Sequence, residues 1–276
     1  MGTLYLIATP IGNLEDISAR ALRILSQVRL IAVEDTRQTR KLLNHYHIQT
    51  PMTSYYEHNK LSKLSVVLAA LEQGDVALVS DAGTPALNDP GYELVKAALQ
   101  AGHSVSPIPG PSAPVAALVA SGLPTDSFLY LGYLPRKASE RRQKLAQVAD
   151  LPYTLIFLET PHRLLEALQD LHETLGDRTV AAARELTKMH EEIFRGTLAQ
   201  AREHFQQQAP RGEFTLVVAG KTTIESPWSD EKLHQALLER LKRGDSPAHI
   251  AGEIAALSGR PRREIYQRVM ELQRNS

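Results

Sequence analysis

Four short apolar segments in the first part of the chain constrain the fold more than any other feature. Each is continuously apolar rather than alternating with polar residues, and they cover residues 4–9, 30–33, 76–80 and 105–108. Helical patterns lie between them, and one is expected to begin at Asp89-Pro90 and to end at Gly102. Continuously apolar strands are typical of a sheet covered on both faces, and intervening helices indicate parallel crossovers. The sequence therefore predicts an N-terminal α/β domain over residues 1–118.

The second part of the chain has more strand candidates than helices. Its apolar segments cover residues 154–158, 179–183, 192–197 and 214–218. Only two clear helical patterns interrupt them, over residues 164–175 and 198–207. This pattern predicts a second α/β domain, over residues 119–222, with a mixed sheet.

The last part of the chain has no strand candidate. Residues 221–229, which contain Pro227, are interpreted as a linker. Helical patterns follow over residues 230–242, 247–257 and 262–272. The expected fold class is therefore α/β: two α/β domains, then a small all-helical extension over residues 230–276. Its helix, glycine turn and helix have a spacing similar to a helix-turn-helix.

Composition narrows the chemistry. The chain has no cysteine, which excludes disulfides, thiolate metal sites and cysteine nucleophiles and fits a reducing cytoplasm. Lys plus Arg and Asp plus Glu both number 31, so a polybasic nucleic-acid coat is excluded while a local basic face is not. No apolar run reaches the roughly 18 residues that a membrane span needs.

The spacing of the histidines along the chain matches no known zinc-binding pattern. We expect a cytoplasmic protein with neither a metal nor a membrane partner.

Three loops rich in glycine, proline and small residues follow three of the predicted strands, at residues 9–13, 81–86 and 109–113. Open α/β sheets bind ligands at the carboxyl ends of their strands, and such loops let backbone approach a ligand closely. The phosphate-binding patterns G-x-x-x-x-G-K-[ST] and G-x-G-x-x-G are missing, and the loops carry no basic residue. Their one carboxylate is Asp81. The loops therefore favour an adenosine-like ligand with little negative charge over ATP.

Seven segments, in this order along the chain, resemble the tetrapyrrole-methylase superfamily and, more closely, its RNA-methylating branch. They read LYLIATPIGNLEDIS (4–18), VEDTRQTR (33–40), VSDAGTPALNDPG (79–91), IPGPSA (108–113), GYLPR (132–136), ETPHR (159–163) and RGEFTLVVA (211–219). Pro10 and Asn13 stand where corrin and porphyrin methylases carry a G-P-G-D loop, and this departure favours the RNA branch.

The resemblance implies two α/β domains of the tetrapyrrole-methylase type, a cleft for S-adenosylmethionine and a homodimer. It implies methylation of the ribose 2′-hydroxyl of a cytidine in the decoding region of 16S (small subunit) ribosomal RNA. The substrate would be this RNA or the assembled small ribosomal subunit. Matched position by position, the expected cofactor-binding residues are Pro10, Ile11, Asp81, Gly83, Thr84, Ser112, Ala113, Leu134, Ala183 and Thr215.

Methyl transfer from a sulfonium is an in-line displacement that needs alignment of donor and acceptor and removal of the acceptor proton. Candidate bases or orienting groups are Asp35, Glu159, Glu185 and Lys188. Glu185 and Lys188 follow a predicted strand at the ligand-binding edge, and a lysine with a depressed pKa can act as a base. Each is also consistent with a surface ion pair. The sequence does not single out one base.

Two basic clusters are candidates for RNA binding. The first comprises Arg136, Lys137, Arg141, Arg142 and Lys144, and the second includes Arg262 and Arg263 in the terminal helices. Arg184 is a further candidate for an RNA phosphate. Salt-sensitive phosphate contact is the functional interpretation, and a solvated helix face is the alternative.

Two other functions stay open at this point. A methylase acting on a tetrapyrrole or another small molecule would need neither the helical extension nor the basic clusters. A ligand-sensing, nucleic-acid-binding regulator would use the terminal helices and would transfer no methyl group.

Overall fold

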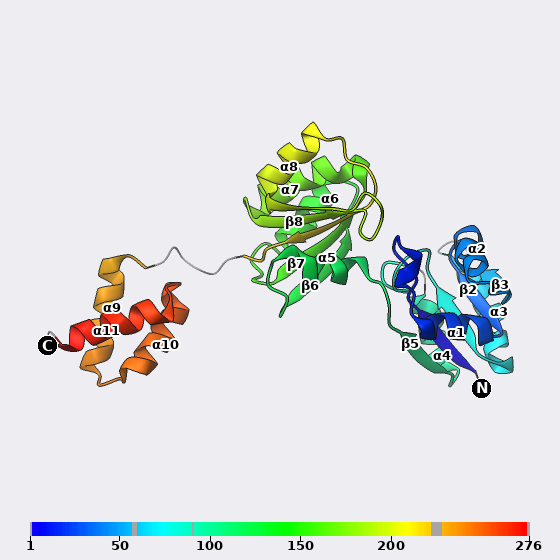
Figure 1. Ribbon diagram of the computed structural model, residues 1–276, viewed down its shortest axis with the longest axis horizontal. Helices are drawn as coiled ribbons and strands as arrows, with labels where there is room; N and C mark the ends of the chain where they lie inside the picture. Colours follow the sequence, from blue (N-terminus) through cyan, green and yellow to red (C-terminus); the bar gives the residue numbers. More distant parts are fainter. Residues whose placement is uncertain (1, 57–59, 90, 222–227, 275–276) are drawn as a thin grey trace. The chain divides into compact units, whose positions relative to one another are not determined.

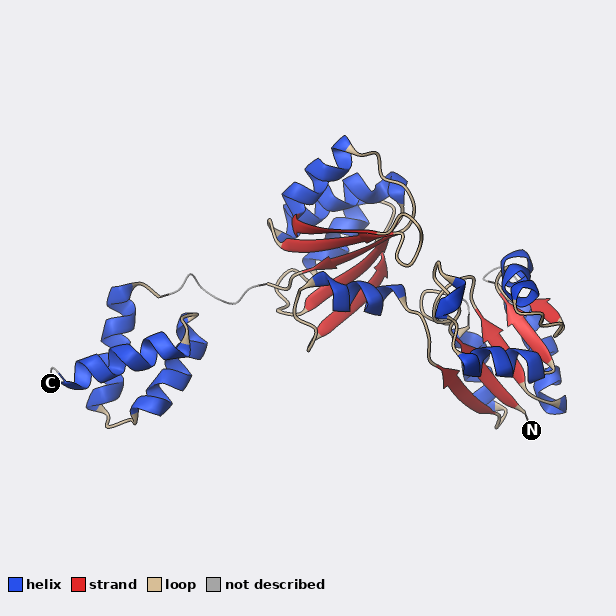
Figure 2. Cartoon of the chain, viewed as in Figure 1, coloured by secondary structure: helices blue, strands red, loops and turns tan. Residues whose placement is uncertain are grey.

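A computed structural model describes residues 2–56, 60–89, 91–221 and 228–274 (Figures 1 and 2). Contacts along the chain divide it into two compact units, Met1–Gly220 and Lys221–Ser276. The first unit holds both sheets, and the second holds three helices. Six residues of the expected linker, 222–227, lie outside the described residues.

The first sheet is fully parallel, as the sequence predicts. Its strands are β1 (Thr3–Ile7), β2 (Leu30–Val33), β3 (Met52–Ser54), β4 (Val76–Val79) and β5 (Ser104–Ile108), in the order β3-β2-β4-β1-β5. Its helices are α1 (Ala19–Gln27), α2 (Thr36–His45), α3 (Lys60–Gln73) and α4 (Tyr92–Gln100), with a short 3-10 turn, η1 (Leu14–Asp16). One apolar cluster joins α1 and α2 to the sheet, and another joins α3 and α4 to it. The sheet is therefore covered on both faces, which is why its strands are continuously apolar.

Helix boundaries in this region follow local capping. The Ser18 hydroxyl accepts a hydrogen bond from the amide of Ala21 at 3.1 Å and starts α1. The helix expected at Asp89-Pro90 begins later, at Tyr92, and Pro90 lies outside the described residues. Gly91 precedes this helix with φ 155°, and a Cβ there would come within 2.9 Å of the Ala86 Cβ. A proline-led start was thus the wrong expectation, because the chain turns at a glycine instead.

The second sheet is mixed, also as predicted. Its strands are β6 (Phe128–Tyr133), β7 (Thr154–Glu159), β8 (Thr179–Arg184), β9 (Glu192–Thr197) and β10 (Phe214–Val218), in the order β6-β7-β10-β8-β9. Only β6 and β7 pair in parallel. The helices are α5 (Ala113–Ser121), α6 (Ala138–Ala146), α7 (Leu164–Leu175) and α8 (Leu198–Gln207), with a 3-10 turn, η2 (Pro161–Arg163).

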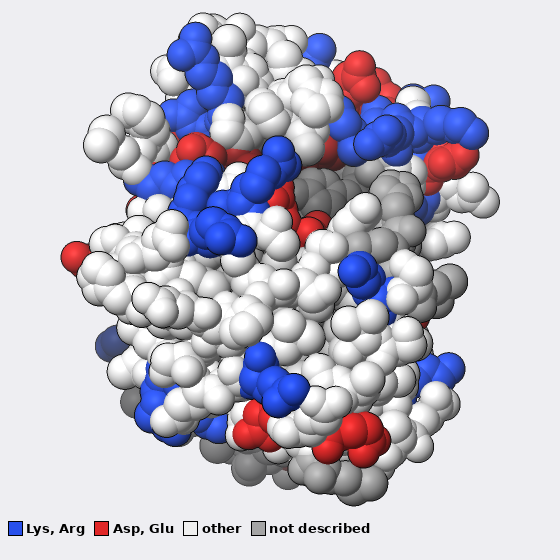
Figure 3. All heavy atoms as spheres, turned by 90° about the vertical axis from the view of Figure 1, so that its right-hand side faces the viewer, with Lys and Arg blue, Asp and Glu red and all other residues white. Residues whose placement is uncertain are grey.

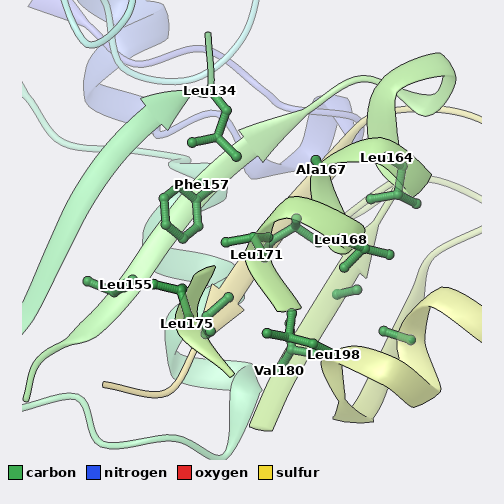
Figure 4. Close-up of a cluster of buried hydrophobic side chains, with 14 of the residues drawn as sticks. Leu134, Leu155, Phe157, Leu164, Ala167, Leu168, Leu171, Leu175, Val180 and Leu198 are labelled. Atoms are coloured by element: carbon green, nitrogen blue, oxygen red, sulfur yellow. The ribbon is translucent and has the colours of Figure 1, made fainter. Parts of the chain in front are cut away.

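The helices of this region cover the second sheet from two sides. Leucines of α7 and α8 pack with Leu155, Phe157 and Val180 in the larger cluster (Figure 4). Ala117 and Leu118 of α5 pack with the strands in a separate cluster. The boundary expected at residue 118 falls inside α5, so the packing favours a boundary before this helix. The limits of the two α/β domains stay a prediction.

The second unit has its own core. Its helices are α9 (Asp230–Lys242), α10 (Pro247–Ser258) and α11 (Arg262–Arg274), close to the three expected ranges. Leu233, Ile250 and Ile265, one from each helix, are completely buried. Gly259 ends α10 with φ 66°, a left-handed conformation that favours glycine. Among the described residues, no helix is long and apolar enough to cross a membrane.

Candidate active site

A cavity of about 260 Å³ lies in the first unit, where the loops after several strands meet. Its walls come from the loops that follow β1, β2, β4 and β5, and from β6, β7, β8 and β10 of the second sheet. Tyr130 and Tyr133 of β6 contribute aromatic surface, and Leu158 and Phe214 contribute apolar surface. The cavity therefore combines the ligand-binding edge of the parallel sheet with side chains of the second sheet.

The three glycine–proline loops singled out in the sequence are hydrogen bonded to one another. Thr9 and Gly83 form a two-way backbone bridge, with N–O distances of 2.9 and 3.0 Å. The Thr84 hydroxyl donates to the Pro111 carbonyl at 3.4 Å. Gly83 has φ 81°, a conformation that an L side chain rarely adopts. The loops after β1, β4 and β5 thus form one backbone surface along the cavity.

Eight of the ten expected cofactor-binding residues line this cavity. They are Ile11, Asp81, Gly83, Thr84, Ser112, Ala113, Ala183 and Thr215. Pro10 is not among the lining residues. Leu134 is 2% exposed and packs near Phe157 in the core of the second sheet, so its side chain is not available to a ligand (Figure 4).

Three carboxylates in the cavity repel one another. Burial raises the pKa of Glu34, and repulsion by Asp89 and Asp81 adds to it. Burial also raises the pKa of Asp81 and of Asp89. The Asp81 carboxylate accepts a hydrogen bond from the amide of Asp35 at 3.0 Å. Sequence reasoning found Asp81 but missed Glu34 and Asp89, which line the same cavity.

The two favoured catalytic candidates form an ion-paired group with a third residue. The Lys188 ammonium donates to Glu185 at 2.9 Å and to Glu213 at 3.1 Å, and all three residues line the cavity. Burial works to lower the pKa of Lys188, but hydrogen bonds to Glu185 and Glu213 outweigh it and raise the pKa. Lys188 is therefore protonated at neutral pH. The raised pKa does not fit the possibility that Lys188 acts as a base through a depressed pKa, and its catalytic role stays a prediction.

The other two candidate bases have structural roles outside the cavity lining. Asp35 caps α2 and pairs with Arg37 at 2.7 Å; the hydrogen bond from the Arg37 side chain lowers its pKa to about 2. Glu159 is 2% exposed and lies 3.5 Å from Arg163. Arg163 in turn donates to the carbonyl oxygens of Leu134 and Pro135, so this pair holds the segment after β6.

The first basic cluster is only partly available to RNA. Arg141 is buried and binds Asp170 at 2.5 Å, so its assignment to RNA binding was wrong: the guanidinium is used inside the fold. Arg142 shares Asp170 at 3.1 Å but remains half exposed. Lys144 donates to the Leu131 carbonyl at 2.9 Å.

The remaining basic candidates differ in accessibility. Lys137 pairs with Glu140 at 3.1 Å on the surface, and Arg136 is exposed. Arg184 pairs with Glu192 at 3.1 Å. In the second unit, Arg262 and Arg263 are exposed. Figure 3 shows Lys and Arg side chains gathered beside a hollow in which acidic atoms are visible.

In the described part of the chain, no group of three or more His, Cys, Asp or Glu side chains is arranged to hold a metal ion.

Comparison with known proteins identifies the family. The Tetrapyrrole (Corrin/Porphyrin) Methylases family matches residues 3–202. A relative from Synechocystis is 47% identical over 276 residues, which cover 99% of each chain. A relative from Halalkalibacterium halodurans is 47% identical over 270 residues, covering 96% of this chain and 93% of its own. A relative from Thermotoga maritima is 46% identical over 222 residues, covering 80% of this chain and all of its own. All three are named ribosomal RNA small subunit methyltransferase I.

Solved structures share the fold at lower identity. Cobalt precorrin-4 methyltransferase, a cobalamin biosynthetic enzyme, is similar with a TM-score of 0.60 and 16% identity, covering 79% of this chain and 94% of its own. Uroporphyrin-III C-methyl transferase from Thermus thermophilus, complexed with S-adenyl homocysteine, has a TM-score of 0.54 and 20% identity, covering 80% and 98%. The chain therefore belongs to the tetrapyrrole methylase family, in the group whose members are named ribosomal RNA small subunit methyltransferase I.

Proposed function

We propose that this protein methylates small-subunit ribosomal RNA, and that the acceptor is the ribose 2′-hydroxyl of a cytidine in the decoding region of the 16S RNA. The observation that carries the proposal is the acidic cavity beneath the three converging loops, in a chain that is 47% identical to an rRNA methyltransferase over nearly its full length. An enzyme acting on ribosomal RNA would work in the cytoplasm, where ribosomes assemble.

S-Adenosylmethionine is the cofactor of this family of methylases, and the cavity residues fit it. Glu34, Asp81 and Asp89 give the cavity a negative charge, and the one Lys or Arg among the lining residues, Lys188, is already paired. Burial is the main cause that raises the pKa of each of these carboxylates, and among the cations only Arg37 acts against it, at Asp81. Each carboxylate would therefore gain from a positively charged ligand. A sulfonium and an ammonium group would supply that positive charge, whereas a triphosphate would be repelled. When bound, the cofactor supplies an electrophilic methyl group on positively charged sulfur.

Asp81 and Thr84 would hold the polar part of the cofactor, and the apolar wall at Ile11, Leu158 and Phe214 suits its adenine. The other predicted contacts, Pro10, Gly83, Ser112, Ala113, Leu134, Ala183 and Thr215, remain proposals, with Leu134 limited to its backbone.

The acceptor proton would pass to a residue of the ion-paired group. Burial works to raise the pKa of Glu185, but the Lys188 hydrogen bond and the Glu213 amide outweigh it and lower the pKa. Glu185 is therefore a carboxylate at neutral pH and can accept a proton as the hydroxyl attacks. Lys188 is protonated, so its role would be to orient Glu185 and to donate a hydrogen bond to the substrate.

We also propose that the protein forms a homodimer. Val115 and Val119 on α5 are 50% and 70% exposed, although the opposite side of this helix packs on the second sheet. The two valines are four residues apart, so they lie next to each other on the exposed side of the helix. A second copy of this chain is the partner we expect there.

One labelling experiment tests the function. The protein is incubated with methyl-labelled S-adenosylmethionine and either deproteinised rRNA, assembled small subunits or a porphyrin. We expect the label to appear in small-subunit RNA. One cytidine linkage of that RNA should then resist alkaline cleavage, because a 2′-O-methyl group blocks that cleavage. Label on a base would refute the 2′-oxygen as acceptor. Label in the porphyrin would identify a tetrapyrrole methylase, and no label in any substrate would favour a regulator.

A further inference from the structure

A second cavity, of about 410 Å³, shares a wall with the first. Glu185 lines both cavities. The second cavity is built from the β8–β9 loop and from the segment between α8 and β10, which are joined by a 3.0 Å hydrogen bond from the Glu185 amide to the Glu213 carbonyl. Its polar lining residues are Arg184, Glu185, His190, Gln208 and Arg211. We call it the Arg211 cavity.

Positive charge in the Arg211 cavity exceeds negative charge. Arg211 is exposed and makes no ion pair with any residue that the structure describes. Arg184 pairs with Glu192, yet its Nε is buried and has no hydrogen-bond partner within the described ranges. The one carboxylate, Glu185, already accepts hydrogen bonds from Lys188 and from the amide of Glu213. The cavity therefore suits an anion.

A phosphodiester is an anion that fits this arrangement. Arginine guanidinium groups match phosphate oxygens with paired hydrogen bonds, and two arginines here reach one cavity. The volume is large enough for a phosphate together with part of a sugar. The first, acidic cavity lies on the other side of Glu185, and we call it the donor cavity because it would hold the methyl donor. Its carboxylates repel phosphate, so the donor cavity would take S-adenosylmethionine while the Arg211 cavity would take the RNA backbone.

We propose that the Arg211 cavity binds a backbone phosphate of the RNA substrate beside the nucleotide that is methylated. This inference rests on the proposed function. The 2′-oxygen and the 3′-phosphate of a nucleotide are attached to adjacent ribose carbons. A phosphate held on one side of Glu185 thus keeps the hydroxyl close to the donor cavity on the other side. Arg211 and Arg184 are positioning residues in this arrangement.

The test compares Arg211→Gln with Arg20→Gln, a control that removes another exposed arginine, on α1. Binding of a short single-stranded RNA is measured by fluorescence anisotropy over a range of salt concentrations. Arg211→Gln is expected to weaken binding several-fold and to reduce the slope of log affinity against log salt by about 1, because one phosphate contact is lost. The control is expected to keep the wild-type slope. Affinity for S-adenosylmethionine, measured by calorimetry, is expected to stay unchanged in both variants.

Equal slopes for Arg211→Gln and wild type would overturn the inference, as would a wild-type protein that does not bind the RNA. Neither measurement depends on methyl transfer. A wild type that binds RNA but methylates none would refute the proposed function, while the difference in slope would still decide whether this cavity holds a phosphate.

Discussion

Asp81 is the residue whose removal should most directly affect the methyl donor. Its carboxylate lies in the loop after β4 and lines the donor cavity. Asp81→Ala is expected to weaken S-adenosylmethionine binding about tenfold or more, because a lost hydrogen bond to a charged group costs about 1.5–3 kcal/mol. Calorimetry measures the effect, with Glu203→Ala on the surface of α8 as the control. An unchanged affinity would remove Asp81 from the site.

Glu34 should make the ligand-free protein less stable as pH rises. Burial, then repulsion by Asp89 and Asp81, holds its folded-state pKa above the unfolded value. The folded state therefore binds this proton more tightly, and stability is lost as pH rises from the unfolded pKa through the folded pKa. Glu34→Gln removes the effect, so it should raise the melting temperature at pH 7 and leave it nearly unchanged at pH 4. Solvent screening limits the gain to less than about 1 kcal/mol. A lower melting temperature at pH 7 would contradict this account.

Arg141 should matter for stability rather than for RNA binding. Its guanidinium and the Asp170 carboxylate are both nearly inaccessible, so Arg141→Leu leaves a buried charge without its main partner. The expected loss is about 3–5 kcal/mol in the free energy of unfolding, measured by urea denaturation. Arg142→Ala, at the half-exposed partner of the same carboxylate, should cost much less. Equal losses from both variants would show that burial of Arg141 is not what stabilises the pair.

Some residues that the sequence predicts at the site do line the cavity, and their place follows from local chain chemistry. Asp81 and Thr84 follow an apolar strand directly, so the sequence alone places them at the sheet edge. Glu34 also follows a strand, and it reaches the donor cavity because β2 lies next to β4 in the sheet. The local sequence does not reveal this strand order, so Glu34 was missed. Arg141 was misassigned because a charged pattern does not distinguish a solvated arginine from one buried against an aspartate on another helix.

At the scale of elements, a bulge in β6 brings this strand against the loop after β4. The register shifts between Tyr130 and Gly132, and Gly132 has φ 63°. A Cβ at this position would overlap the side chain of Asn88, which lines the donor cavity. Gly132→Ala is expected to destabilise the protein by about 1–2 kcal/mol through its backbone conformation alone, and to weaken donor binding as Asn88 shifts. Thermal melting and calorimetry measure the two effects, and Gly176→Ala, where φ is 82° and no atom lies within 4 Å, controls for backbone strain. If both variants retain the same donor affinity, the bulge does not shape the cavity.

Five elements were predicted nearly to the residue, whereas α5 (APVAALVAS) was not predicted although it is almost wholly apolar. The strands β9 and β10 and the helices α7, α8 and α9 match their expected ranges. The helices α2 (TRQTRKLLNH) and α6 (ASERRQKLA) were missed because most of their residues are polar. The strand β3 has only three residues, and β6 is interrupted by its bulge. Tertiary packing, rather than local periodicity, defines these four elements.

At the scale of the whole molecule, the donor cavity belongs to one unit alone. Every residue that lines it falls within Met1–Gly220. The alignment with the Thermotoga relative covers all of that relative but only 80% of this chain. That relative therefore has no counterpart to about a fifth of this chain, and it is still named ribosomal RNA small subunit methyltransferase I. The second unit has a separate core, and its exposed Arg262 and Arg263 would then add affinity for RNA rather than chemistry.

Truncation after Lys221 tests whether the first unit binds the donor alone while the second unit adds affinity for RNA. The first unit keeps its sheets and its cavity, so donor affinity should remain within about twofold of the full chain by calorimetry. Methylation of small subunits should show a KM raised about tenfold with little change in kcat, because loss of uniform binding raises KM alone. The full-length double variant Arg262→Gln/Arg263→Gln is the matched control: it should raise KM in the same direction if phosphate contacts by these arginines carry the effect. A truncated protein with wild-type KM would show the second unit to be dispensable for this substrate. A large fall in kcat would instead show that the second unit takes part in the chemical step.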